Sequence, residues 1–257
     1  MDQGGIFAPG SDALIAKLEL AGKLGEEDRE LLRAVCSRVR RIEAGSDIVS
    51  EGAKADHVHL VLSGWAARYK LVGDGSRQIT AFLIPGDFCD AHVAILRRMD
   101  HSIVAVTQAS VAYISHEDFD QLPVRRPELA RALWWATLVD ESVLRAWIVN
   151  LGRRDAYAGI AHLICELHAR LQNVGLVEDD GFELPLTQEV LADALGLTPV
   201  HTNRIIQRLR AEKLVTLKSG RLAILDAGGL RRAADFDPDY LHAALRNGNG
   251  KQAGSAT

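Results

Sequence analysis

The chain has 257 residues, of which 47% are hydrophobic and 25% charged, and its formal net charge is −4. The length suggests about two domains, and the composition is ordinary for a soluble globular protein. No apolar run approaches the roughly 18 residues that a membrane-spanning helix needs, and the start MDQGGIFAPG lacks the basic-then-apolar pattern of a signal peptide, so we expect a cytoplasmic protein without a membrane partner.

In the N-terminal part of the chain, the spacing of apolar residues changes from helical to β-type near residue 40. Residues 11–39 carry leucines at helical spacing and predict a helix. From Ile42 to Ile114, short β-type runs alternate with glycine-marked turns such as Gly73 to Gly75 and Pro85 to Asp87. The runs are 47–50, 57–62, 66–72, 78–84, 102–107 and 111–114. Many short strands at regular spacing predict an antiparallel sandwich or barrel.

A long helix is predicted from Phe119 to Asn150, ending at Gly152. Its apolar surface is wider than a single seam, which indicates a helix that packs on two partners, the barrel on one side and a second copy of the chain on the other. The stripe that we assign to the dimer contact is Leu133, Thr137, Asp140, Leu144, Trp147 and Leu151.

The C-terminal part begins with a predicted hinge at residues 153–155 and a helix over 156–171. Thr187 is suited to cap the next helix, which breaks at Gly196. Thr198 and Pro199 then suit the first positions of another helix. Two short helices joined by a glycine-containing turn predict a helix-turn-helix. Two short strands, 214–216 and 222–225, follow it and predict a wing.

The polar face of the second helix carries residue types that read bases or hold phosphates. Six basic residues and one acidic residue lie between 196 and 221, a net charge of +5 in a chain that is acidic overall. We assign base reading to Val200, His201, Asn203 and Arg204. We assign phosphate contacts to Thr187, Thr198, Gln207, Arg208, Lys218 and Arg221. The alternative is a solvated basic helix or a protein-contact module.

The order of these parts resembles the Crp/Fnr family of bacterial transcription regulators. The motifs that carry the resemblance are Val61 to Gly64, Pro85 to Asp87, Gly152 to Asp155 and Leu191 to Thr198. It implies an α+β fold with a jelly-roll-like antiparallel β-roll sensor domain, a long dimerisation helix and a C-terminal winged helix-turn-helix. It also implies a homodimer on palindromic double-stranded DNA, a signal sensed in the β-roll, and RNA polymerase as a partner if the protein is an activator.

The domains expected from this resemblance are 1–118 for the β-roll with its N-terminal helix, 119–152 for the dimerisation helix, 153–235 for the winged helix-turn-helix and 236–257 for the tail. In the tail, a short helix is expected to dock through Phe236, Tyr240 and Leu241, and residues 247–257 are expected to be disordered.

Relatives in this family read DNA with a Glu and, four residues later, an Arg on the recognition helix. Arg204 matches that Arg, and its guanidinium suits bidentate bonds to guanine. Val200 stands in place of the Glu and cannot accept a hydrogen bond from cytosine. We therefore expect an apolar contact there, such as a thymine methyl group, and a different operator.

The β-roll lacks the residues with which relatives bind two known kinds of effector. Cyclic-nucleotide-binding relatives hold the ligand with a Gly-Glu pair and an Arg-Ser pair, where this chain has Asp90-Ala91 and His101-Ser102. Carboxylates at Asp87, Asp90 and Asp100 would repel an anion, so cyclic AMP is not expected. The iron-sulfur relatives need about four thiolates, and only Cys36 and Cys89 lie in this half, with Cys165 in the other.

The candidate pocket for an unknown small-molecule effector consists of Asp87, Cys89, Asp90, His92, His101 and Ser102. Cys89 and His92 are three residues apart, a spacing that suits a metal or haem ligand pair, and Cys89 could sense redox as a thiolate. The alternative is that Cys89 fills an apolar gap. We expect no metal and no cofactor.

Two other functions remain to be compared with the regulator. The chain could be a small-molecule-binding or signalling module whose helix-turn-helix contacts protein. It is not expected to be an enzyme, since no nucleophile elbow, phosphate loop or His-Glu-x-x-His pattern occurs.

Overall fold

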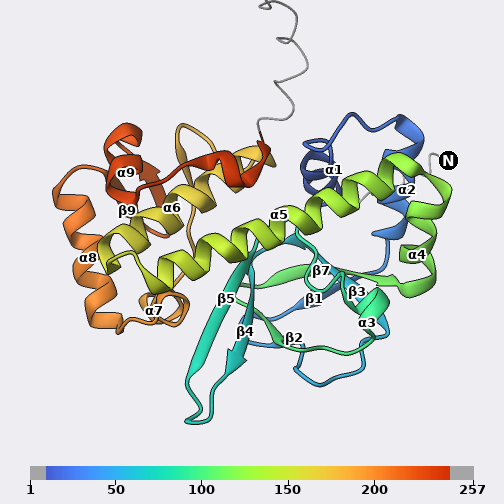
Figure 1. Ribbon diagram of the computed structural model, residues 1–257, viewed down its shortest axis with the longest axis horizontal. Helices are drawn as coiled ribbons and strands as arrows, with labels where there is room; N and C mark the ends of the chain where they lie inside the picture. Colours follow the sequence, from blue (N-terminus) through green and yellow to red (C-terminus); the bar gives the residue numbers. More distant parts are fainter. Residues whose placement is uncertain (1–9, 244–257) are drawn as a thin grey trace, which may run out of the picture.

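The computed structural model describes residues 10–243, and its N-terminal half is a roll of two antiparallel sheets (Figure 1). One sheet has the strand order β1-β7-β3 and the other β2-β6-β4-β5. The strands are β1 (Val39–Ile42), β2 (Asp47–Val49), β3 (His57–Ser63), β4 (Ala66–Leu71), β5 (Arg77–Leu83), β6 (Ser102–Ala105) and β7 (Ala109–Ser115). The α+β class and the β-roll are confirmed, although β1 begins at Val39, the last residue of the region predicted as helix.

Two helices, α1 (Ser11–Leu18) and α2 (Glu26–Val35), replace the single helix predicted over residues 11–39. The break has a local cause at Gly25, whose extended backbone precedes α2 and whose N–H donates to the Asp28 carboxylate at 2.9 Å. This side-chain bond satisfies a backbone donor at the start of a new helix. The prediction of one continuous helix was therefore wrong.

The predicted helix from Phe119 to Asn150 is also divided, into α4 (His116–Arg125) and α5 (Pro127–Gly152). Arg126 between them has φ −139° and ψ 103°, the extended conformation that a following proline favours. Pro127 is then the first residue of α5, where its missing N–H costs nothing. A short helix, α3 (Val93–Leu96), lies in the loop between β5 and β6.

The C-terminal part combines helices with a third small sheet of order β8-β10-β9. Its elements are α6 (Ala156–Asn173), β8 (Gly181–Glu183), α7 (Gln188–Leu195), α8 (Pro199–Ala211), β9 (Val215–Lys218), β10 (Arg221–Ile224), α9 (Ala227–Ala234) and the 3₁₀ turn η1 (Pro238–Leu241). The winged helix-turn-helix is confirmed, and β8 is a strand that the sequence analysis missed.

The long helix α5 runs across the molecule between the β-roll and the C-terminal elements (Figure 1). On its inward face Val143 and Trp147 pack in a core that continues from Phe82 in β5 to Ile164 in α6. The rings of Trp147 and Phe82 meet edge to face, with centroids 5.8 Å apart. The β-roll and the winged helix therefore share one hydrophobic core.

The outward face of α5 is apolar and exposed. Trp134 is 71% exposed and Ile148 is 69% exposed. The face comprises Trp134, Thr137, Leu138, Leu144, Ile148 and Leu151. Exposed apolar residues that follow one helical face mark a surface suited to a partner.

Two residues of the predicted dimer stripe lie on the inward side instead, which corrects that assignment. Trp147 is only 4% exposed, and its indole N–H donates to the Glu166 carboxylate at 3.2 Å. Asp140 forms an ion pair of 3.1 Å with Arg68 of the same chain. Both apolar faces of α5 have helical spacing, so periodicity alone did not reveal which one the chain's own core covers.

The other four residues of the predicted dimer stripe do not all lie on the exposed face either. Thr137, Leu144 and Leu151 lie on the exposed face, whereas Leu133 is partly buried against the core of the β-roll. The exposed face is thus rotated by about one residue from the predicted stripe.

The C-terminal segment docks on α6 around His162, as predicted for Phe236, Tyr240 and Leu241. The His162 ring contacts Phe236 edge to face and stacks on Tyr240, and Leu241 is buried. The predicted disorder of residues 247–257 lies outside the described residues. Within residues 10–243, no helix has both the length and the apolar character to cross a bilayer.

Protonation of His162 should weaken the fold. Its side chain is buried, and burial, together with the nearby charge of Arg154, lowers its pKa to about 4. The unfolded chain therefore binds a proton at pH 5 that the folded chain does not, and stability should fall by about 2–3 kcal/mol as the pH drops from about 6.5 to about 4.

The control is His162→Gln, which retains an acceptor for the Asn150 amide, now 3.1 Å from the His162 Nδ1 atom, but has no titrating group. Urea unfolding at several pH values should give a smaller loss of stability for this variant over the same interval. If the free energy of unfolding falls equally with pH in both proteins, protonation of His162 is not the cause of the loss.

Candidate nucleic-acid interface and sensor region

Capping residues define the ends of the two helices of the helix-turn-helix. The Thr187 hydroxyl accepts the backbone N–H of Val190, and the Thr198 hydroxyl accepts that of His201, each at 3.2 Å. Gly196 ends α7 with φ +64°, a left-handed conformation that glycine adopts without strain. These caps set the start of both helices and hence the faces that they expose.

The recognition face of α8 points away from the core. Thr202, Ile205, Ile206 and Leu209 are buried, while Val200, His201 and Arg204 are exposed and Asn203 is half-buried. Val200 is 71% exposed although it is apolar. The four residues predicted to read bases therefore lie on the side opposite the buried stripe or at its border.

The wing is a tight hairpin between β9 and β10, with Lys218 paired to Arg221. Its two turn residues, Ser219 and Gly220, have φ of +49° and +78°. Positive φ at both positions is the geometry of a type I′ turn, which matches the twist of the strands. The turn presents Lys218 at the exposed tip of the hairpin.

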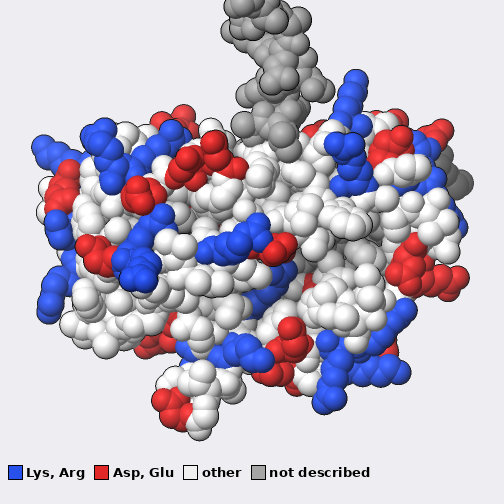
Figure 2. Space-filling view, viewed as in Figure 1, with Lys and Arg blue, Asp and Glu red and all other residues white. Residues whose placement is uncertain are grey.

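Two of the basic side chains predicted to contact DNA are unengaged. Within residues 10–243, neither Arg204 nor Lys218 makes a hydrogen bond or an ion pair with another part of the chain. Figure 2 shows Lys and Arg side chains along the edge of the molecule where α8 lies. An unpaired cation at the surface retains its bonding capacity for a phosphate or a base.

The other predicted phosphate ligands have intramolecular contacts. Arg208 is ion-paired with Glu212 at 2.8 Å and lies 4.2 Å above the Tyr157 ring. Arg221 donates to the Glu178 backbone carbonyl at 2.7 Å. Gln207 accepts a hydrogen bond from Arg210 at 3.0 Å. These three side chains must exchange existing contacts to reach a phosphate.

Four of the six residues assigned to an effector pocket, Asp87, Cys89, Asp90 and Ser102, are buried among contacts of their own chain, which corrects that grouping. Asp87 is buried between α1 and α6, where it forms ion pairs with Lys17 at 2.6 Å and Arg170 at 2.7 Å. Burial alone would raise the pKa of Asp87, but these two cations outweigh it and lower the pKa to about 2. Asp87 is thus a structural anion.

Cys89, Asp90 and Ser102 are buried in the β-roll. Asp90 accepts the His59 backbone N–H at 2.7 Å, and its carboxylate lies 2.5 Å from the His59 Nδ1 atom. Burial, with a contribution from the charge of Asp90, raises the pKa of the Cys89 thiol well above its ordinary value. The Ser102 hydroxyl accepts the Glu51 N–H at 2.8 Å. Each of these groups already has a structural role.

His92 and His101 are the two members of the predicted set that the structure brings together. Their ring centroids are 5.4 Å apart, and both lie beside the Asp100 carboxylate. Burial lowers the pKa of His101, and the Asp100 hydrogen bond partly opposes this shift.

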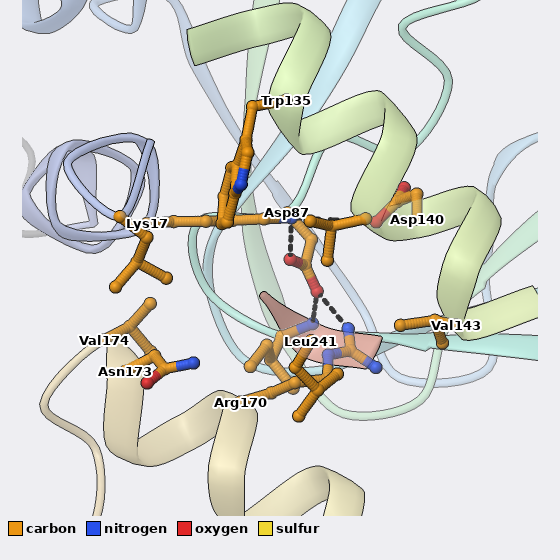
Figure 3. Close-up of a pocket in the computed structure, with 12 residues that line it drawn as sticks. Lys17, Asp87, Trp135, Asp140, Val143, Arg170, Asn173, Val174 and Leu241 are labelled. Carbon is orange, nitrogen blue, oxygen red and sulfur yellow. Dashed lines mark hydrogen bonds and ion pairs between the residues drawn. The ribbon is translucent and has the colours of Figure 1, made fainter. Parts of the chain in front are cut away.

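Several residues that join the domains were missed by the sequence analysis. Arg170 in α6 bonds to Asp87, to the Phe82 carbonyl at 3.0 Å and to Glu166 at 3.2 Å. Glu166 in turn accepts hydrogen bonds from Trp147 and, at 3.0 Å, from Tyr240. Figure 3 shows Lys17, Asp87 and Arg170 converging from three elements beside a small pocket, which Trp135 and Leu241 also line.

The approach of α1 to this cluster depends on Gly86. This glycine has φ +91°, and a Cβ atom there would lie 2.8 Å from the backbone of Ala13. Only glycine combines that φ with so close a contact at low cost. The Pro85 to Asp87 turn noted in the sequence therefore places Asp87 against Lys17.

The winged helix also contacts the β-roll directly. Arg77 at the start of β5 is ion-paired with Asp193 of α7 at 2.7 Å. The next residue, Gln78, donates its amide to the Ala194 carbonyl at 3.2 Å. The first helix of the helix-turn-helix is therefore attached to a strand of the β-roll.

Two family descriptions match the chain. Residues 39–125 match the cyclic nucleotide-binding domain, and residues 160–233 match the Crp-like helix-turn-helix domain. The first range covers both sheets of the β-roll, and the second runs from α6 to α9. The two matches coincide with the two halves of the observed fold.

Two similar proteins are named as transcription activators. The chain is 29% identical over 225 residues to transcriptional activator protein FnrL of Cereibacter sphaeroides, covering 80% of this chain and 90% of that protein. It is 30% identical over 207 residues to a probable transcriptional activator of Rhizobium leguminosarum bv. viciae, covering 79% and 81%. The solved structure of FixK2 from Bradyrhizobium japonicum has a TM-score of 0.68 at 23% identity, covering 76% of this chain and 96% of that one.

Proposed function

Because the chain belongs to the Crp/Fnr family of DNA-binding transcription regulators, we propose that it binds a palindromic operator as a homodimer, with a DNA affinity set by a signal in the β-roll. The family consists of transcription regulators and not of enzymes. We also propose a cytoplasmic location and, when the protein activates transcription, a contact with RNA polymerase.

The observation that carries the operator proposal is the outward face of α8. Arg204 is exposed and unengaged within the described residues, on a helix whose opposite side is buried. A guanidinium in that position suits the O6 and N7 atoms of guanine. The exposed methyl groups of Val200, one turn earlier, suit a thymine methyl group.

Arg204→Ala should reduce specific binding more than general binding. Loss of a bidentate base contact costs about 1–3 kcal/mol, about 5-fold to 150-fold in operator affinity, with a much smaller effect on random DNA. Lys218→Ala is the matched control, because loss of a phosphate contact from the wing should weaken the affinities for operator and random DNA by a similar factor. Fluorescence anisotropy with operator and random duplexes measures both ratios, and equal losses on both duplexes for both variants would exclude the assignment.

The homodimer proposal is supported by the exposed face of α5. A two-fold dimer through this face would present two α8 helices to half-sites about one helical turn, roughly 34 Å, apart. The exposed apolar residues run from Trp134 to Leu151 on the side of α5 away from its own β-roll core, with the exposed Glu141–Arg145 ion pair among them.

A route for the signal is supported by the contacts between the domains. The Asp87–Arg170 ion pair joins a β-roll loop to α6, and the Arg77–Asp193 ion pair joins β5 to α7. A ligand changes DNA affinity only if it binds one arrangement of the domains better than another. These two ion pairs are contacts that such a rearrangement would alter.

We propose that the signal is neither cyclic AMP nor oxidation of Cys89. Asp87 and Asp90 already hold partners from their own chain, and Asp100 adds an exposed negative charge at the segment where relatives hold a cyclic phosphate. Cys89 is fully buried, and its raised pKa keeps it protonated, whereas the thiolate is the reactive form.

The alternative function, in which the helix-turn-helix contacts protein, is tested by measuring DNA affinity at several salt concentrations. A helix and wing that neutralise phosphates release counterions, so the logarithm of DNA affinity should fall linearly with the logarithm of salt concentration. Affinity for DNA that does not depend on salt between about 50 and 200 mM would favour the protein-contact function.

A further inference from the structure

Three side chains with metal-binding chemistry meet at the junction of α3 and β6. One nitrogen each of His92 and His101 and one carboxylate oxygen of Asp100 all lie within 4.8 Å of one another. Asp100 Oδ1 is 2.6 Å from the His101 Nδ1 atom and 3.5 Å from the His92 Nε2 atom. The two histidines therefore flank one carboxylate.

One imidazole nitrogen of each histidine in this cluster has no hydrogen-bond partner among residues 10–243. Within the described residues, the Nε2 atoms of both His92 and His101 are shielded from solvent and have no hydrogen-bond partner. A buried polar atom without a partner costs free energy. A bound cation would give such nitrogens the partner that the protein itself does not supply.

The backbone around the cluster is held in place before any ligand binds. The Asp100 carbonyl accepts a bond from Lys70 at 2.7 Å, and the Ser102 hydroxyl anchors the start of β6 to Glu51. On the other side, the His92 carbonyl accepts the Leu96 N–H at 2.8 Å within α3. The three donor atoms therefore come from backbone segments that the fold already holds in place.

We propose that His92, Asp100 and His101 form a binding site for a divalent first-row transition-metal ion, with zinc as the reference ion. Two imidazoles and one carboxylate are ligands that suit zinc, cobalt or nickel, whereas magnesium and calcium take oxygen ligands. Three protein ligands leave a fourth tetrahedral position for water or for a small anion. The ion would link α3 to the start of β6.

The site revises two expectations from the sequence. No metal was expected there, and the pair considered for a ligand set was Cys89 with His92. Cys89 is fully buried in the core of the β-roll, and the residues beside His92 are Asp100 and His101. The proposal does not depend on the operator or on the dimer, because metal binding is measured without DNA.

Cobalt titration of the full chain, kept reduced and first treated with a chelator, tests the site directly. We expect one ion per chain, visible d–d absorption, no thiolate-to-cobalt charge-transfer band, and displacement by zinc with a dissociation constant below about 10 µM. His92→Ala and His101→Ala should each weaken zinc binding at least tenfold in calorimetry. Asp100→Asn, an exposed and nearly isosteric change, should do the same without affecting the fold.

His57→Ala is the control, because His57 lies outside the cluster and contacts Arg38. It should bind zinc with the affinity of the unaltered chain. The proposal is overturned by binding weaker than about 100 µM, by a thiolate charge-transfer band, or by cluster variants and His57→Ala that all titrate alike. Circular dichroism of each variant separates a lost site from a lost fold, and a folded Asp100→Asn variant with unchanged affinity also overturns it.

Discussion

Ile148→Asp is expected to convert the protein from a dimer to a monomer and to weaken operator binding at least 100-fold. Ile148 is 69% exposed near the centre of the C-terminal half of the apolar face on α5. In a two-fold dimer the change would place two carboxylates in an apolar contact, which is costly without a partner. A monomer then loses the second half-site, and linked sites commonly gain a factor of about 10² to 10⁴ over single ones.

Val124→Asp provides the matched control for this substitution. Val124 is 74% exposed but lies on α4, away from the apolar face of α5. Sedimentation equilibrium should give a monomer for Ile148→Asp and a dimer for Val124→Asp, and anisotropy should give a loss of operator affinity for the first only. Dimers of unchanged affinity in both variants would rule out this face as the dimer contact.

Arg170→Ala is expected to lower the free energy of unfolding by about 3–5 kcal/mol, because it leaves charged partners buried. Among the described residues, Asp87 would keep Lys17 as its only cation, and Glu166 would lose its sole cationic partner. Burial already raises the pKa of Glu166, with Arg170 as the largest opposing influence. The variant should therefore be far less stable although it removes no apolar core residue.

Urea unfolding of three further variants separates this network from a general charge effect. Arg145→Ala breaks only an exposed ion pair with Glu141 and should cost less than about 1 kcal/mol. Asp87→Asn combined with Arg170→Ala should cost less than the sum of the two single changes, since the pair is coupled. Additive costs, or an Arg170→Ala variant as stable as Arg145→Ala, would contradict the proposed role of this network.

The parts of the fold that the sequence predicted best are those with local signals. Thr187, Gly196 and Thr198 act on neighbouring backbone groups, so the caps and turn of the helix-turn-helix could be assigned residue by residue. By contrast, β8 has only three residues and is a strand because β10 pairs with it, a contact about 40 residues away. A strand of that kind has almost no pattern of its own.

The predicted sensor pocket failed for a related reason. Asp87 was included in the predicted effector pocket, but its partner Arg170 is 83 residues later in the chain. No pattern in the sequence near Asp87 predicts its contact with Arg170. The same distance effect hid the inward position of Trp147, whose indole bonds to Glu166 on the next helix.

Selection of bound sequences from random DNA tests the central claim most directly. We predict enrichment of an inverted repeat whose half-sites are about one helical turn apart, with a guanine in each half-site whose selection disappears in Arg204→Ala. Recovery of no enriched sequence, or of a single half-site without its inverted copy, would contradict the account of this protein as a dimeric operator-binding regulator.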